Sequence, residues 1–456
     1  MEPFRLHVFV CNQHKPEGVP CCAARGSGPV LELLRREIAA RGLEDQVQVT
    51  ESGSLGLCEH GPNLVVYPEG IWYSGVTAAD IPEIVEAHFQ QNRPVERLLR
   101  HDPAALREEI LGNRQKMIAG RRAREAAGVL PEELSDRIRG FQESRVVLTA
   151  LELDLFTAVG EGASAEAVAA RLGAAPRSTE MLLNALAALH LVSKQDGVFH
   201  NSPAAARYFT AGSRDNARPG LLHTAHLWHR WSSLTEAVRA GTSVAREEPG
   251  GRPEDRSEDW TEAFIAAMHR NASERAPLVV RAVGELSGRM LDVGGGSGAY
   301  SIAFAKANPG LRAEILDQPQ VLPIAQRHIR EAGLEDRVSA RPGDLRSDPF
   351  GTGYELVFLS AICHMLSPAE NRDLFARSRQ ALVPHGRIVV QDFILEPDKT
   401  SPRFAALFAL NMLVGTAAGS SYSEPEYAAW LREAGFANVQ RVRLPGITGL
   451  MMANRP

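Results

Sequence analysis

The chain has 456 residues, which exceeds the size of one compact core and predicts two to four domains. Its hydrophobic fraction of 44% and charged fraction of 23% are ordinary for a globular protein. A net charge of -5 gives no general reason to expect nucleic acid or an anionic membrane as a partner. No apolar run is long enough to span a bilayer, and five cysteines in a chain of this size do not predict a disulfide framework.

Residues 1–100 predict a small α/β domain. The first residues, MEPFRLHVFVC, enter a strand pattern without the apolar core of a signal peptide, so we expect a cytoplasmic protein. The apolar spacing predicts strands at 6–11, 47–52 and 63–76, and amphipathic helices at 28–43 and 78–90. Residues 101–130 follow with many Arg and Glu and few apolar positions, which predicts a solvated helical connector.

The rest of the chain divides into a helical part and an alternating part. Residues 131–225 carry short helical patterns and end in a predicted hairpin, with Asp196 and Gly197 in its turn. In residues 226–456 strands and helices alternate, which predicts a mostly parallel sheet with helices on both faces. The predicted strands are 289–295, 312–317, 337–344, 354–362, 386–395, 437–444 and 449–455.

A glycine-rich loop, DVGGGSG, follows the first strand of this alternating part. Gly294, Gly296 and Gly298 allow positive φ and let a ligand approach the backbone closely. The loop by itself is ambiguous, because Gly294, Gly296 and Ala299 also satisfy the dinucleotide pattern G-x-G-x-x-A. A tight turn without a ligand is the third interpretation.

Three acids at successive strand ends distinguish these interpretations. Asp292 precedes the loop, where a carboxylate can attract a cationic methionyl group. Asp317 ends the second strand, where it could accept from both ribose hydroxyls, and Asp344 ends the third, near an adenine amino group. An acidic rim of this kind would repel a pyrophosphate but suits a sulfonium. The sequence therefore predicts S-adenosylmethionine as the cofactor.

Residues 131–456 resemble the O-methyltransferase family that includes plant caffeate and hydroxyindole enzymes. DVGGGSG resembles the family's cofactor loop, ILDQPQV its ribose segment, and GDL, with Asp344 and Leu345, its adenine-side segment. The resemblance implies an α/β protein in which a class I Rossmann-like methyltransferase domain, 226–456, follows a helical winged-helix dimerisation domain, 131–225. It also implies a homodimer that acts on a small-molecule methyl acceptor.

The same resemblance implies the catalytic residues. SAICHMLSP places His364 at the general base, and Asp392 in VVQDFIL matches the carboxylate that orients it. A neutral imidazole suits removal of a proton from a phenol, whose pKa is about 10. Met268 and Met412 match substrate-contacting methionines. We therefore expect methylation of a hydroxyl on a small aromatic molecule.

The chain departs from the family at two places near this base. After the histidine the chain has Met365, Leu366, Ser367 and Pro368 and lacks the Trp and Asp that usually follow in the family, and Ser421 stands where plant enzymes have a second glutamate. One supporting carboxylate favours an acceptor that ionises more easily, such as a thiol with a pKa of about 8.5. S-methylation is therefore the alternative reaction, and a cofactor-binding regulator without turnover is the alternative that is not an enzyme.

A helix-turn-helix with a wing is predicted at 163–200, so DNA binding is a rival function. The second helix, 176–190, contains Arg177 and no other Arg or Lys, whereas DNA recognition needs outward basic and amide groups. Its apolar face predicts protein contact instead, through Met181, Leu182, Leu183, Leu186 and Leu189. Trp228, in the aromatic segment 221–231, is expected in the core, with lining of the substrate pocket as its other role.

Residues 1–100 also resemble the thioredoxin-like [2Fe-2S] ferredoxin domain. Cys11 and Cys22 match the family's first cysteine pair and Cys58 its last ligand, whereas Ser54 stands at the remaining position. Cluster chemistry prefers four thiolates, so the resemblance implies a degenerate domain with vestigial ligands and no normal cluster. Cys21 is an additional thiol beside the site. An altered cluster, with electron transfer to the methyltransferase domain, is the alternative.

Overall fold

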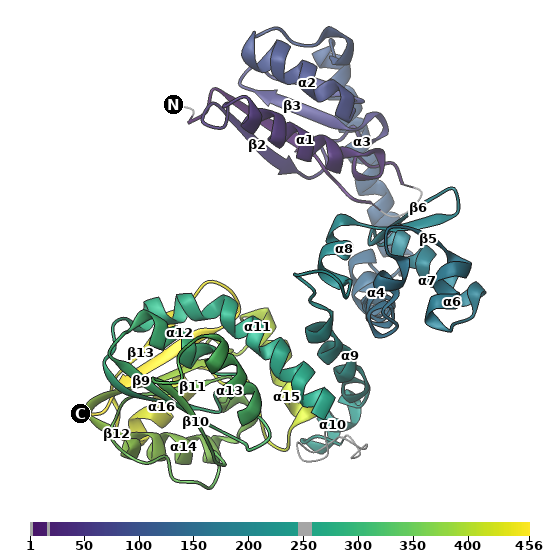
Figure 1. Ribbon diagram of the computed structural model, residues 1–456. Helices are drawn as coiled ribbons and strands as arrows, with labels where there is room; N and C mark the ends of the chain where they lie inside the picture. The colour runs from purple at the N-terminus through teal and green to yellow at the C-terminus, as the bar shows by residue number, and fades with distance from the viewer. Residues whose placement is uncertain (1–2, 16–18, 245–257) are drawn as a thin grey trace. The chain divides into compact units, whose positions relative to one another are not determined.

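The structure is a computed structural model that describes residues 3–15, 19–244 and 258–456. It divides into two compact units, Met1–Arg139 and Gly140–Pro456, and each is described by itself (Figure 1). Among the described residues, no helix combines the length and the apolar character that crossing a membrane requires.

The first unit is built on a four-stranded sheet in the order β2-β1-β3-β4. β1 pairs parallel with β2 and antiparallel with β3, and β3 pairs antiparallel with β4. The strands are β1 (Leu6–Cys11), β2 (Val47–Ser52), β3 (Asn63–Tyr67) and β4 (Ile71–Ser74). The helical segments are η1 (Ala23–Arg25), α1 (Ser27–Ala40), η2 (Cys58–His60), η3 (Ala78–Asp80), α2 (Ile81–Glu83), η4 (Ile84–Gln90), η5 (Glu96–Leu98) and α3 (Pro103–Ala126).

The prediction of one strand over 63–76 is wrong, because β3 and β4 form a hairpin there. Pro68 lacks the backbone N–H that a strand interior needs, and Gly70 adopts a φ of +70°. The other predicted elements of this unit are confirmed. The connector is the helix α3, which begins where the Asp102 side chain accepts from the amides of Ala104 and Ala105.

The boundary between the units falls within helix α4 (Glu132–Glu152), and the helical part that α4 opens contains a three-stranded sheet in the order β5-β7-β6. Asp196 and Gly197 turn the predicted hairpin with φ values of 49° and 80°, so this prediction is confirmed. The elements are α4 (Glu132–Glu152), α5 (Leu155–Val159), β5 (Ala163–Ser164), α6 (Ala165–Leu172), α7 (Pro176–Ala188), β6 (Val192–Gln195), β7 (Val198–Asn201), α8 (Pro203–Phe209), α9 (Arg218–Ser232) and α10 (Leu234–Ala240).

The apolar face predicted on α7 is divided in the structure. Leu183 and Leu186 are fully buried in the core of their own domain, whereas the Met181 side chain is 57% exposed. An α-helix turns through 100° per residue, so residues two apart point to nearly opposite sides. The expectation of one continuous contact surface is therefore corrected: Met181 is available on the exposed side and the two leucines are not.

The remainder of the second unit is a seven-stranded sheet in the order β10-β9-β8-β11-β12-β14-β13. The first five strands are parallel, and β14 is antiparallel to both neighbours, which confirms the predicted sheet. Its strands are β8 (Gly288–Val293), β9 (Leu311–Asp317), β10 (Val338–Pro342), β11 (Tyr354–Ser360), β12 (Leu382–Asp392), β13 (Ala437–Arg443) and β14 (Gly449–Asn454). The helices are α11 (Glu258–Val283), α12 (Ala299–Ala307), α13 (Leu322–Glu331), η7 (Cys363–Met365), α14 (Pro368–Ala381), α15 (Arg403–Gly415) and α16 (Glu424–Glu433).

Apolar cores on both faces of this sheet hold the helices in place. One core joins the sheet to α11, α12 and α13, and the other joins it to α14 and α16. The chain leaves β8 toward β9 on one side and returns to β11 on the other, so β8 and β11 form the switch point of the topology. Ligands of open α/β sheets bind beyond the carboxyl ends of the strands at such a point.

Candidate functional site

The glycine loop connects β8 to α12 at the switch point. Gly294, Gly296 and Gly298 have φ values of +67°, +57° and +77°, which L-residues with side chains rarely adopt. A Cβ on Gly294 would lie 2.3 Å from the Ile362 side chain, whereas no heavy atom lies within 4 Å of the corresponding position at Gly296. The backbone at Gly296 is therefore open to a ligand.

Asp292 lies buried directly beneath this loop. Its Oδ2 accepts a hydrogen bond of 2.7 Å from Ser301 Oγ, and its Oδ1 has no hydrogen-bond partner among the described residues. Burial raises the pKa of Asp292 to about 7, and the negative charge of Asp317 contributes in the same direction. A Cβ on Gly295 would lie 2.8 Å from the carboxylate, so glycine is needed above it. The free oxygen is an acceptor that a cationic ligand could satisfy.

Asp317 ends β9 and holds the glycine loop from the side. Its Oδ2 accepts from the Gly296 amide at 2.7 Å, and its Oδ1 accepts from the Gln318 amide at 2.7 Å. Burial raises the pKa of this carboxyl as well. Each carboxylate oxygen has a second lone pair, so the residue can accept further hydrogen bonds while it fixes the loop.

The adenine-side candidates lie after β10. Asp344 is exposed, and its Oδ1 accepts from the Arg346 amide at 2.8 Å. The Leu345 side chain lies 3.8 Å from the position that a Cβ on Gly294 would occupy. The structure thus brings Leu345 to the glycine loop and places Asp344 on the adjacent surface turn.

His364 and Asp392 form a buried pair beyond β11 and β12. Asp392 Oδ1 accepts from His364 Nδ1 at 2.7 Å and from the Phe393 amide at 2.8 Å. Its Oδ2 accepts from the His364 amide and from the Tyr427 hydroxyl, both at 3.1 Å. An ionised carboxylate can only accept, so the neutral tautomer that suits this contact has its proton on Nδ1 and leaves Nε2 as an acceptor.

Two phenylalanines contact this histidine, and a third packs against both of them. The His364 ring lies 4.9 Å from the Phe408 ring at an interplanar angle of 85°, and 5.7 Å from the Phe393 ring. Phe404 stacks on Phe408 with 5.9 Å between ring centroids, and it is 41% exposed. Our sequence interpretation missed all three, although Phe404 and Phe408 are four residues apart on one face of α15 and Phe393 directly follows Asp392.

The predicted methionines lie on α11 and α15. Met412 is buried, and Met268 is half-buried. His269, the neighbour of Met268, lies with Nδ1 2.8 Å from Ser297 Oγ in the glycine loop. The Met412 carbonyl accepts from Thr416 Oγ1 at 2.7 Å, in the segment that leads back to the histidine.

Of the two tryptophans on α9, Trp231 lies beside the site, whereas the sequence had pointed to Trp228. Trp228 packs against the core of the helical part, and Arg145 lies 5.6 Å above its ring. Trp231 Nε1 instead donates to Asn411 Oδ1 at 3.0 Å, on the helix that carries Met412 and Phe408. Tryptophan spacing alone could not distinguish these roles, because both residues lie on the same helix.

Ser421 lies in the segment that closes over the histidine backbone. The Ser420 amide donates to the His364 carbonyl at 2.9 Å, and a Cβ on Gly419 would lie 2.4 Å from that carbonyl oxygen. The buried Ser421 Oγ has no hydrogen-bond partner among the described residues. Because Ser421 supplies no carboxylate, Asp392 is the carboxylate that contacts His364 among the described residues.

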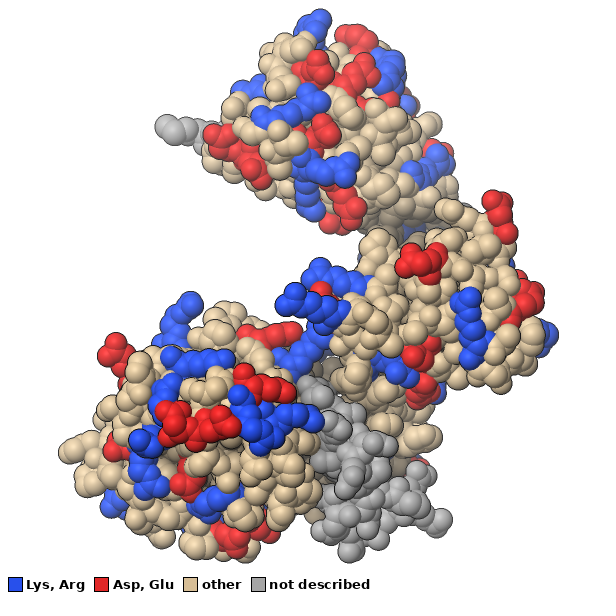
Figure 2. Space-filling view, in the orientation of Figure 1, with Lys and Arg blue, Asp and Glu red and all other residues tan. Residues whose placement is uncertain are grey.

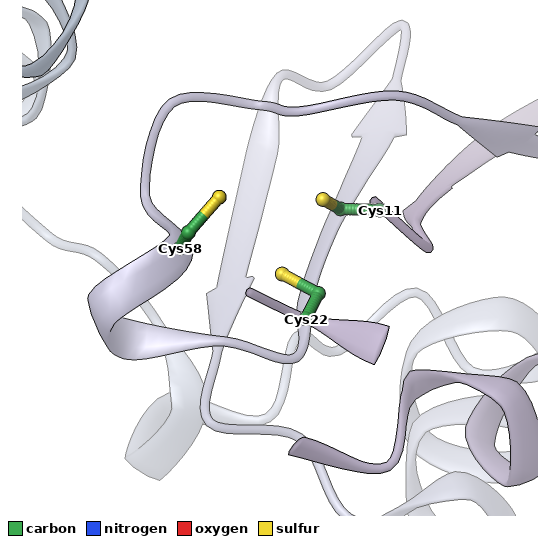
Figure 3. A group of neighbouring side chains, drawn as sticks. All are labelled: Cys11, Cys22 and Cys58. Carbon is green, nitrogen blue, oxygen red and sulfur yellow. The ribbon is translucent and has the colours of Figure 1, made fainter. Parts of the chain in front are cut away.

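In the first unit, Cys11, Cys22 and Cys58 lie together (Figure 3). Their sulfur atoms are all within 4.8 Å of one another, and Ser54 Oγ lies 3.3 Å from Cys58 Sγ. The sulfur of Cys21 accepts instead from the Ala24 amide at 3.4 Å. A [2Fe-2S] cluster prefers four thiolates shared between two irons, whereas here three sulfurs converge on one space and the fourth donor is a hydroxyl, so the set does not fit a normal cluster.

Comparison with known proteins identifies the second unit. The O-methyltransferase dimerisation domain matches residues 135–211, and the O-methyltransferase domain matches residues 231–437. A 3-hydroxy-5-methyl-1-naphthoate 3-O-methyltransferase of Streptomyces sahachiroi is 34% identical over 338 residues, which are 70% of this chain and 94% of that protein. Acetylserotonin O-methyltransferase of Bos taurus is 32% identical over 71% of this chain and 97% of its own length. Human N-acetylserotonin methyltransferase in complex with SAM aligns with a TM-score of 0.61 at 26% identity, over 71% of this chain and 96% of that one. The chain therefore belongs to the O-methyltransferase family, whose enzymes use S-adenosylmethionine, and it carries the dimerisation domain of that family.

Proposed function

We propose that the protein transfers a methyl group from S-adenosylmethionine to a hydroxyl of a small aromatic molecule, with His364 as the general base. The observation that carries this proposal is the buried His364–Asp392 pair beside the rings of Phe393 and Phe408. This arrangement places a fixed proton acceptor beside a flat apolar surface.

The proposed cofactor site is the acidic rim around the glycine loop. When bound, the cofactor supplies an electrophilic methyl group on a positively charged sulfur. Asp292, with one unpartnered oxygen, suits a cationic ligand, and Asp317 can accept from ribose hydroxyls while it holds the loop. The remaining members of the proposed site are Gly294, Gly296, Gly298, Asp344 and Leu345.

His364 would remove the proton of the acceptor as the new oxygen–carbon bond forms. Asp392 holds Nδ1, so Nε2 is the atom that accepts this proton. Asp392 is thus a positioning residue, and it also stabilises the imidazolium that results. Four donors keep the carboxylate in place before any substrate arrives, which lowers the cost of ordering the site during the reaction.

The acceptor would bind against the phenylalanine surface. Aromatic pairs with centroids 4.5–7 Å apart are favourable, so a flat ring suits the space beside Phe404 and Phe408. The relatives described above are named for a hydroxynaphthoate and for acetylserotonin, both aromatic acceptors. Met268 and Met412 are the further substrate contacts in this proposal, and Trp231 fixes α15 beside them. Trp228, for which the sequence left pocket lining open, packs instead against the core of the helical part.

A turnover screen with labelled cofactor tests this proposal. Phenols, catechols, indoles and small thiols are offered to the wild-type protein, and labelled products are identified by mass spectrometry. We expect methyl ethers of phenolic compounds. Labelled thioethers without methyl ethers would contradict the proposal.

Thiol methylation is the second candidate, and the isolated Ser421 hydroxyl favours it. With one carboxylate at the base, an acceptor that ionises readily would depend less on His364. A His364→Ala variant that loses activity toward phenols but retains it toward thiols would support this candidate.

We further propose a homodimer and four segments: a thioredoxin-like domain at 1–100, a connector at 101–130, the dimerisation domain at 131–225 and the methyltransferase domain at 226–456. The strand order and directions of the first sheet support the thioredoxin-like assignment.

Acidic and basic side chains are interspersed on the face shown in Figure 2, which favours a protein partner over nucleic acid. Light scattering at micromolar concentration should give the mass of a dimer, and a monomer would contradict this assignment.

A further inference from the structure

Three buried thiols converge from separate elements of the first unit. Cys11 ends β1, Cys22 directly precedes η1 and Cys58 opens η2. Figure 3 shows their sulfur atoms directed toward a common space. All three sulfurs lie within 4.8 Å of one another, so a single small ion between them could contact all three.

Polar groups fix the position of the Cys22 sulfur. The buried Asn63 donates from Nδ2 to Cys22 Sγ at 3.5 Å and to the Leu57 carbonyl at 2.7 Å. Ser74 Oγ donates to Asn63 Oδ1 at 2.7 Å, which fixes the amide with its N–H groups toward the sulfur. A Cβ on Gly61 would lie 2.4 Å from Cys22 Sγ, so the glycine leaves room for this sulfur.

Ser54 supplies a hydroxyl beside the three sulfurs, at a position that solvent can reach. Ser54 is exposed, and its Oγ lies 3.3 Å from Cys58 Sγ while it accepts from the Gly56 amide at 3.2 Å. Cys21 does not supply a fourth thiolate, because its sulfur accepts from the Ala24 amide. The set of donors is therefore three sulfurs and one oxygen.

We propose that Cys11, Cys22 and Cys58 bind one Zn²⁺ ion, with the Ser54 hydroxyl or a water as the fourth ligand. A tetrahedral zinc with Zn–S bonds of about 2.3 Å places its sulfurs about 3.8 Å apart, which lies within the observed limit. Zinc accepts such a mixed donor set, whereas a normal [2Fe-2S] cluster, which the sequence already leaves one thiolate short, prefers four thiolates on two irons. The ion would link β1, the segment that follows it and η2, and the site is independent of the proposed methyl transfer.

Metal analysis of the full-length protein tests this proposal first. The chain is purified under reducing conditions without added metal, and zinc, iron and acid-labile sulfide are counted per chain. We expect one zinc and neither iron nor sulfide. X-ray absorption at the zinc edge should show three sulfur ligands and one oxygen. The proposal would be overturned by stoichiometric iron or by a reduced protein without metal. A disulfide between Cys11 and Cys22 that persists under the reducing conditions would also overturn it.

Cobalt substitution in variants then assigns the ligands. After zinc is removed with a chelator, one equivalent of Co²⁺ should produce thiolate-to-cobalt charge-transfer bands and the visible bands of a tetrahedral ion. Cys58→Ser should weaken both, whereas the matched control Cys21→Ser should retain them at full intensity. Asn63→Ala should weaken Co²⁺ binding roughly 10- to 100-fold. Circular dichroism confirms that each variant is folded, and unchanged spectra in folded Cys58→Ser would contradict the assignment.

Discussion

The two ends of the proposed active site differ in how completely the protein satisfies its carboxylates. Asp392 accepts four hydrogen bonds from His364, Phe393 and Tyr427. Asp292, equally buried on the same sheet, accepts from Ser301 and keeps one oxygen without a partner among the described residues. The base is therefore held by the protein alone, whereas the cofactor end offers an acceptor that a ligand would satisfy.

This difference predicts separate effects of substitution at the two ends. Changes at the base should reduce the rate of the chemical step and leave cofactor affinity unchanged. Changes at the acidic rim should reduce cofactor affinity, and saturating cofactor should restore most of the rate.

The largest effect is expected for His364→Ala, which removes the proposed proton acceptor. Turnover of a phenolic acceptor should fall roughly 10²- to 10⁴-fold, while the Kd for the cofactor measured by calorimetry stays the same. The control is His385→Asn at an exposed residue with a φ of +65°, a conformation that Asn tolerates. Wild-type turnover of His364→Ala at neutral pH would show that positioning alone drives the reaction.

Asp392→Asn should have the next largest effect. The amide nitrogen would face a hydrogen-bond donor wherever it is placed, because both oxygens of Asp392 accept from two donors each. We expect a loss of turnover on the order of 10²-fold, together with a lower melting temperature, since a buried donor is left unpaired. Asp373→Asn, at an exposed aspartate that pairs with Arg377, is the matched control. A variant with full turnover would contradict the positioning role.

Asp317→Ala tests the other end of the site. Loss of its hydrogen bonds should cost about 1.5–3 kcal/mol, roughly ten- to a hundredfold in cofactor affinity. Turnover at saturating cofactor should change little. The exposed Asp336→Ala serves as the control. Equal cofactor affinity in wild type and Asp317→Ala, measured by calorimetry, would remove Asp317 from the binding site.

The smallest effect is expected from pH. Burial raises the pKa of Asp292 to about 7, so the carboxyl is mostly neutral at pH 6 and mostly ionised at pH 8. A cationic ligand favours the ionised form, and cofactor affinity should therefore rise roughly tenfold over this interval. S-adenosylhomocysteine lacks the sulfonium charge and should respond less. Asp292→Asn should abolish the difference in pH dependence between the affinities for the two ligands. If that difference persists in the variant, a group other than Asp292 causes it.

The parts of the structure that the sequence predicted are those that local patterns determine. The glycine loop and the acids at the ends of β8 and β9 could be located because strand alternation shows where each strand stops. The hairpin in 63–76 was missed although Pro68 and Gly70, which break the strand by backbone geometry, separate its two apolar runs.

Other features depend on packing between distant segments and could not be predicted in this way. Which side of α7 faces its own core is decided by the contacts of Leu183 and Leu186 with other helices and strands. The phenylalanines of α15 meet Phe393 only in the folded domain. The convergence of three cysteines was predicted by resemblance, but the distances between their sulfurs, which bear on the number of metal ions, follow from the fold.

The position of β14 has a consequence for how the protein is made. β12, which ends in Asp392, lies between β11 and β14, and Tyr427 also reaches Asp392 from α16. Both partners follow β12 in the sequence, so a ribosome synthesises them after the strand that they support. During translation the proposed base pair lacks these partners until that later segment has emerged and folded. We therefore expect a chain that stops before α16 to lack methyltransferase activity.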